Sequence, residues 1–139
     1  MKKSGFQKVV EVRKIQEKQA QQHVADAERL RVIEEDVLGE IHQHKRNALG
    51  NARGTQRMSI AEMQLVRSHL SSLSKQIETQ TSVVIQVQEE EKVKRELLLK
   101  KSQEKKMVEI LHAKKLKEHA KESESKEQKL MDEFAQRRR

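Results

Sequence analysis

The sequence contains no Cys, Pro, Trp or Tyr, and Phe6 and Phe134 are its only phenylalanines. Without cysteine, a disulfide scaffold and a thiolate zinc site are excluded. Hydrophobic residues make up 34% of the 139 residues and charged residues 37%, so the apolar side chains are too few to fill a globular core of this length. No runs of alternating apolar residues between turn signals are present either. The composition therefore excludes compact sandwiches, barrels and doubly wound sheets.

Long apolar stretches are also missing. Leu97, Leu98 and Leu99 form one of the longest apolar runs, far short of a membrane span. No apolar segment follows the basic start of the chain, so we expect no secretory signal. What remains is rich in Glu, Lys, Gln, Arg, Leu and Ala, a composition typical of long helices. We expect an all-α protein that is cytoplasmic or peripheral to a larger assembly.

The first part of the chain predicts an amphipathic helix over about residues 5–48. Its apolar residues recur at a mean spacing near 3.6, which is typical of one helical stripe. The row is Val9, Val12, Ile15, Ala20, Val24, Ala27, Leu30, Ile33, Val37 and Ile41. A single stripe on a long helix needs a partner to cover it.

A turn is predicted at about residues 49–58. Gly50, Asn51 and Gly54 lie close together there, and residues of these types favour turns. Ser59 precedes Glu62 by three residues, a capping-box spacing that predicts the start of a second helix over about residues 59–137. The alternative is one continuous helix that frays at its glycines.

The second helix carries a strict heptad repeat, which predicts left-handed coiling around a partner. The row is Met63, Val66, Leu70, Leu73, Ile77, Gln80, Val84, Val87, Glu91, Lys94 and Leu98. The polar members Gln80, Glu91 and Lys94 are of the kind that fixes register or partner orientation. After Leu98 we expect the phase of the repeat to shift.

Two stripes joined by a short turn predict a long two-helix antiparallel coiled-coil hairpin, a single coiled-coil domain over residues 1–139. Folding about residue 54 would place Phe6 opposite roughly residue 102 and leave a projecting C-terminal helix. Leu130, Met131 and Phe134 would form an apolar anchor for a partner on that projection.

No catalytic arrangement is predicted. Serines such as Ser71 have no base in a cleft, because a two-helix hairpin has no cleft. His42 and His44 are two residues apart and point in different directions on a helix, so we expect neither to bind a metal. We expect neither an enzyme nor a bound cofactor or metal.

The segment from Glu127 to Arg137 resembles the C-terminal end of the FliJ family sequences. It includes the run Lys129, Leu130, Met131, Asp132, Glu133, Phe134, Ala135. That family is the stalk-like soluble component of the bacterial flagellar export apparatus, related to the YscO-like proteins of type III secretion. The resemblance implies a coiled coil similar to the central stalk of rotary ATPases. It implies that the stalk inserts into the hexameric export ATPase (FliI-like), promotes hexamer assembly, contacts the export gate (FlhA-like) and recycles export chaperones. It also implies a cytoplasmic location, peripheral to the inner membrane at the flagellar base through these partners.

The resemblance assigns two contact sites. The contact with the ATPase ring would comprise Val9, Leu130, Met131, Phe134 and Arg137. The contact with the export gate would comprise His69, Leu73, Gln76 and Gln80, all facing outward.

Two alternative functions stay open. A general coiled-coil holdase would suit the methionines and the unpaired tail. A nucleic-acid binder would suit the net charge of +8, of which residues 100–139 contribute 13 basic against 8 acidic residues. Nucleic acid is the less favoured partner, because aromatic side chains for base stacking are missing and the basic residues form no continuous face.

Overall fold

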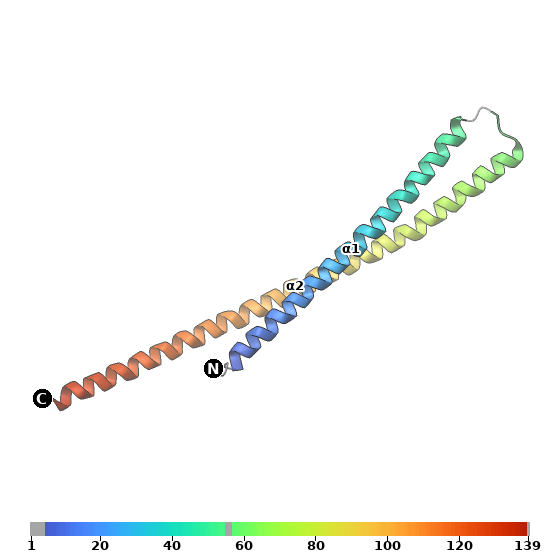
Figure 1. Ribbon diagram of the computed structural model, residues 1–139. Coiled ribbons are helices and arrows are strands. Elements are labelled where there is room, and N and C mark those ends of the chain that lie inside the picture. Colours follow the sequence, from blue (N-terminus) through green and yellow to red (C-terminus); the bar gives the residue numbers. More distant parts are fainter. Residues whose placement is uncertain (1–4, 55–56, 139) are drawn as a thin grey trace. The chain divides into compact units, whose positions relative to one another are not determined.

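The computed structural model describes residues 5–54 and 57–138 and consists of two long helices. Helix α1 spans Gly5–Gly54 and α2 spans Ile60–Arg137, and no strand occurs in the described ranges. Figure 1 shows α1 followed by α2 along the chain. The helices pack against each other in opposite directions, so the prediction of an all-α antiparallel hairpin is confirmed.

Helix α2 begins at a capped N-terminus. The Glu62 backbone N–H donates a hydrogen bond of 3.2 Å to the Ser59 hydroxyl oxygen. The Met63 N–H donates to the Ser59 carbonyl oxygen at 3.0 Å, the first bond of the helix. Ser59 is therefore the N-cap residue that the spacing to Glu62 predicts.

Helix α1 continues to Gly54 instead of ending near residue 48. Gly50 and Gly54 both lie within it, and no described glycine has a positive φ. A Cβ added at either position would meet no atom within 4 Å. The expected turn signals are therefore accommodated as ordinary helical residues, at the usual entropic cost of glycine. Thr55 and Gln56, which the predicted turn includes, lie outside the described residues.

The chain divides by its contacts into two units, which we describe separately. Unit 2 is Gln21–Leu97, and unit 1 combines Met1–Ala20 with Leu98–Arg139. In unit 2 the antiparallel direction is evident from three contacts: as the residue number rises along α1 it falls along α2. The contacts are Glu28 with Arg95, Arg31 with Glu91, and Glu35 with Gln88.

The core of unit 2 follows the heptad row of α2. Leu73, Val84 and Val87 are buried, and Glu91 at the same spacing is buried with them. These are positions that the strict repeat predicts, because only residues separated alternately by three and four face a coiled partner continuously.

The apolar row predicted on α1 is only partly the packed row. Val24 is buried and Ala27 half-buried, but Leu30, Ile33 and Val37 are exposed. The half-buried residues at this level are instead one position further along: Arg31, Glu34 and Leu38. The physical reason is the spacing: the two consecutive three-residue steps from Ala27 through Leu30 to Ile33 rotate the apolar row away from a seam that alternates three and four.

Unit 1 has a smaller and more polar seam. Val10 and Ala20 of α1 are buried, whereas Val9, Val12 and Ile15 of the predicted row are exposed. On α2 the heptad spacing continues beyond Leu98, so the expected shift of phase is wrong. The half-buried residues at that spacing are Lys101, Lys105, Val108 and His112.

The register in unit 1 also differs from the expected one. The Phe6 ring stacks on His112, with ring centroids 5.6 Å apart, instead of lying opposite roughly residue 102. The Lys115 ammonium lies 4.9 Å from the centroid of the same ring, a cation–π contact. Since α1 extends to Gly54, each of its residues pairs with one further along α2.

Candidate functional site

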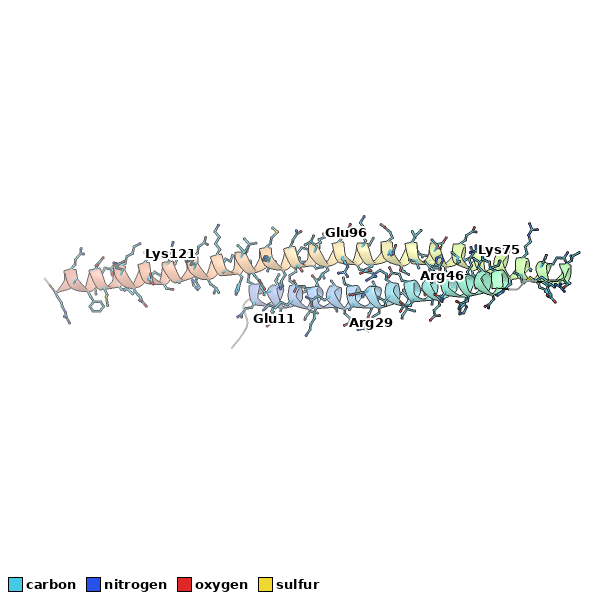
Figure 2. The ribbon with its side chains drawn as sticks, turned by 90° about the horizontal axis from the view of Figure 1, so that it is seen from above. Glu11, Arg29, Arg46, Lys75, Glu96 and Lys121 are labelled. Carbon is cyan, nitrogen blue, oxygen red and sulfur yellow. The ribbon has the colours of Figure 1, made fainter. Side chains whose placement is uncertain are left out.

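The expected ring-contact residues of α2 lie on a stretch of unit 1 whose side chains are all exposed. Every described side chain from residue 113 to 138 is exposed, which makes this stretch the projecting C-terminal helix. Figure 2 shows Lys121 on this stretch, where no part of α1 lies beside α2. Beyond Lys115, whose ammonium lies near the Phe6 ring, the stretch is therefore a single helix whose whole circumference is accessible.

Leu130, Met131, Phe134 and Arg137 gather on one face of that helix. Leu130, Phe134 and Arg137 are spaced four and three apart, and Met131 precedes Phe134 by three, so the four side chains are neighbours. Met131 is 75% exposed and Phe134 is 67% exposed. We call these four residues the C-terminal cluster: an apolar surface with a guanidinium at its edge.

Val9 does not join the C-terminal cluster. It is exposed on α1, three residues from Phe6, which contacts His112. Leu130 lies 18 residues beyond His112 on α2, about 27 Å at the rise of an α-helix. Val9 and the cluster are therefore two separate surfaces of unit 1.

The expected gate-contact residues divide into exposed and packed ones. His69 and Gln76 are exposed on α2 of unit 2. Leu73 is only 5% exposed, so the expectation that it faces outward is wrong: it belongs to the heptad row that packs on α1. The Gln80 amide is also turned inward, because it donates to the Glu34 carbonyl oxygen at 3.0 Å and to the Glu34 carboxylate.

A shallow hollow of about 370 Å³ lies beside Gln76. Gln76 and Gln80 both line it, so the packed Gln80 still borders an accessible surface. Its lining is Ile41, Ser72, Lys75, Gln76, Thr79 and Gln80. Ile41 is the one apolar residue in this lining, and the other lining residues carry polar groups that can take part in hydrogen bonds.

A charged network crosses the seam of unit 2 at Glu91. The Arg95 guanidinium donates to Glu91 Oε1 at 2.7 and 3.0 Å, and Arg31 donates to Glu91 Oε2. The bonds from Arg95, and then those from Arg31, lower the pKa of Glu91 below its ordinary value. Glu35 accepts from Gln88 and from Arg31, both at 3.0 Å, and these bonds lower its pKa as well. The polar member of the heptad row therefore enters the seam as a paired anion.

Unit 1 holds a similar arrangement that the sequence did not reveal. The Lys105 ammonium donates to Glu17 at 2.9 Å, and Arg13 donates to Glu104 at 2.9 Å. The bond with Lys105 lowers the pKa of Glu17, and the same bond raises the pKa of Lys105. The heptad spacing beyond Leu98 is the signal that could have found these pairs, because it places Lys105 in the seam opposite Glu17.

An open groove between the helices of unit 2 was also missed. It has a volume of about 830 Å³, and its apolar lining is Ala27 and Leu30 from α1 with Ile85 and Val93 from α2. Leu30 belongs to the predicted apolar row, but its place beside the seam, facing Ile85 and Val93, follows only from the register of the two helices.

The described residues contain no group of three or more histidine or acidic side chains that could hold a metal ion, and His42 and His44 are exposed. Among the described residues, no helix is long and apolar enough to cross a membrane.

A comparison with protein families identifies the family of the chain. The chain matches the family described as flagellar FliJ protein over residues 1–139, its whole length. No curated protein and no solved structure matches the chain. The family match agrees with the ending around Phe134 and with the two-helix hairpin. The chain therefore belongs to the FliJ family and is a flagellar export-related protein.

Proposed function

We propose that the protein is a non-enzymatic stalk of the flagellar export apparatus whose C-terminal helix binds the export ATPase ring. The observation that carries the proposal is the C-terminal cluster: Leu130, Met131 and Phe134 are exposed on a helix that has no partner in the described part of unit 1. Exposed apolar side chains on one helical face are a common mode of partner binding. The adjacent Arg137 adds a charged contact at the rim.

Assembly of the ring would follow from linkage. A stalk that binds the assembled hexamer more tightly than its separate subunits shifts the equilibrium toward the hexamer. Such a role needs binding surface and no catalytic group. Val9, as a second and separate surface of unit 1, would add a weaker contact.

The test mixes the purified protein with the cognate export ATPase and follows ATP hydrolysis and particle mass. We expect the protein to raise both the hydrolysis rate and the hexamer fraction. Phe134→Ala should raise the protein concentration that gives half-maximal stimulation of the ATPase by about 30-fold, the size of an interface hot spot. Leu116→Ala is the matched control, because Leu116 is exposed on the same helix outside the cluster. Equal activity of both variants would exclude the cluster as the ring contact.

We propose further that His69 and Gln76 contact the export gate. Gln80, which lines the same hollow as Gln76, would lie at the edge of this contact. These residues are accessible, whereas Leu73 acts through packing on α1. The double variant His69→Ala, Gln76→Ala should lose binding to the cytosolic domain of the gate, measured by calorimetry. Ser71→Ala, at an exposed position on a different face of α2, should bind as before. Export chaperones are the third proposed class of partner.

A general holdase is the second candidate, favoured by the exposed apolar side chains Met107, Ile110 and Leu111 of unit 1. It predicts capture of an unfolded client protein and suppression of its aggregation. If the protein captured such a client tightly but left the export ATPase unchanged, the holdase would replace the stalk.

A further inference from the structure

The open groove of unit 2 is an apolar surface that lies between two packed helices. Leu30 is 42% exposed on the α1 side, and Ile85 and Val93 are 61% and 52% exposed on the α2 side. Each of these side chains leaves apolar area in water, which costs free energy in proportion to its area. Its volume of about 830 Å³ is about twice that of the hollows beside Gln76 and beside Val32, which measure about 370 and 390 Å³.

The apolar surface continues beyond the groove along both helices. On α1, Ile33 and Val37 follow Leu30 at steps of three and four, and both are exposed. On α2, Leu97 follows Val93 by four and is exposed as well. The apolar surface is therefore elongated along the helices, a shape that matches the apolar face of another helix. An enclosed small-molecule pocket has a different shape.

The rim of the groove is acidic. Asp26 of α1 and Glu89 and Glu90 of α2 line it, against the single ammonium of Lys94. Arg29 lies 3.7 Å from Asp26 and offsets part of that charge, which leaves Glu89 and Glu90 as the rim carboxylates that a cationic partner would meet. An acidic rim contrasts with the net charge of +8 of the whole chain.

We propose that this groove binds a basic amphipathic α-helix of a partner protein. Its apolar side chains, at spacings of three and four, would pack on Leu30, Ile85 and Val93 and form a local three-helix arrangement. Its lysines or arginines would lie beside Glu89 and Glu90. The site is distinct from the C-terminal cluster and from His69 and Gln76, so it goes beyond the ring and gate contacts.

Charge argues for this occupant over the alternatives. A second copy docking by the same face would bring two acidic rims together, because a two-fold interface pairs a patch with itself. An anionic membrane surface would repel Glu89 and Glu90. A basic helix satisfies both the apolar floor and the acidic rim.

The experiment uses the full chain and two fluorescent helical peptides of about 18 residues, five turns each. Both peptides carry the same leucine face, and one has lysines where the other has glutamates on its flanks. Fluorescence anisotropy measures the dissociation constant of each. We expect the basic peptide to bind at least about tenfold more tightly than the acidic one, because several rim charges act together.

Two groove variants locate the site. Glu89→Lys with Glu90→Lys should weaken the basic peptide about tenfold and strengthen the acidic one. Ile85→Gln with Val93→Gln should weaken both peptides about tenfold through lost apolar burial. Circular dichroism checks folding, and glutamine has the higher helix propensity, so these exposed changes keep the helix.

The matched control is Glu124→Lys with Glu127→Lys, which makes the same change of net charge outside the groove. Glu124 and Glu127 are exposed on the stretch of α2 that belongs to unit 1. If the control weakened the basic peptide as much as the rim variant did, binding would be diffuse electrostatics and the groove site would be wrong. Equal affinity of the two peptides, or no binding at about 100 μM, would overturn it as well. Self-association of the full chain that the Ile85, Val93 variant abolishes would assign the groove to a second copy instead.

Discussion

Glu91 is the residue that most clearly links the sequence pattern to the packing. It occupies a heptad position of α2, where an apolar residue is the usual choice, and it is only 6% exposed. The structure supplies Arg31 from α1 and Arg95 from α2 as partners. Removing one partner of such a buried pair leaves a charge unpaired, so the pairing penalises any other register of the two helices.

Acid should weaken the hairpin through this network. The folded-state pKa values of Glu91, Glu35 and Glu17 are lowered from 4.5, so their stabilisation is complete above that value and is lost as the pH falls through the lowered pKa values. We expect the melting temperature, followed by circular dichroism, to fall on acidification from pH 7 to pH values below about 4.

Glu91→Gln tests the assignment of that loss. The variant cannot lose a proton, so its melting temperature should start lower at pH 7 and fall less on acidification than that of the natural chain. Glu96→Gln, at an exposed carboxylate away from α1, should keep the natural pH dependence. An unchanged pH profile in the Glu91 variant would mean that this pair does not set the acid sensitivity.

Leu73 gives a second prediction at the scale of a single side chain. Because it is 5% exposed, Leu73→Ala should lower the free energy of unfolding by about 2–3 kcal/mol, measured by urea denaturation. Leu65→Ala, at a position that is 71% exposed, should change it by less than about 0.5 kcal/mol. Equal effects would contradict the register of α2 in unit 2.

At the scale of the helices, glycines within α1 show that a glycine does not by itself mark a turn. Gly50 and Gly39 both lie within α1, with no atom in the way of an added Cβ. Gly50→Ala should therefore raise the free energy of unfolding by about 0.5–1 kcal/mol, because alanine removes the entropic cost of glycine in a helix. Gly39→Ala, in the middle of α1, serves as the reference for the same change. A loss of stability at Gly50 alone would show that a turn with positive φ begins there.

The two helices differ in how much of their packing the sequence could predict. On α2 the steps of three and four are regular, so the buried Leu73, Val84 and Val87 follow from the pattern alone. On α1 the apolar row and the seam diverge after Ala27. Which row packs depends on the partner helix, and a single-helix pattern cannot supply that information.

The candidate sites show the same division. Leu130, Met131 and Phe134 were correctly expected to be exposed, because they lie beyond the reach of α1. Leu73 and Gln80 were expected to face outward, although both belong to the heptad row that is also expected to pack on a partner helix. In the structure both residues pack on α1. The groove at Leu30 and Ile85 could not be predicted, because it depends on which residues of the two helices lie side by side.

At the scale of the whole molecule, the buried apolar residues and the proposed ring contact lie on different parts of the chain. The buried apolar residues, from Val10 of α1 to Val87 of α2, all belong to the paired helices. None of the described side chains from residue 113 to 138 is buried or half-buried. Pairs within this single helix are worth only a few tenths of a kcal/mol each.

Removal of residues 117–139 should therefore separate stability from partner binding. The shortened chain retains the Phe6–His112 contact and the Glu17–Lys105 pair, so its free energy of unfolding should stay within about 0.5 kcal/mol of the natural value. Its stimulation of the export ATPase should disappear, because the C-terminal cluster is gone. Val84→Ala is the opposite case: it should lower stability by about 1–2 kcal/mol but keep the stimulation at temperatures below its melting point. Full stimulation by the shortened chain would move the ring contact to the paired part of the hairpin, where Val9 is the remaining candidate.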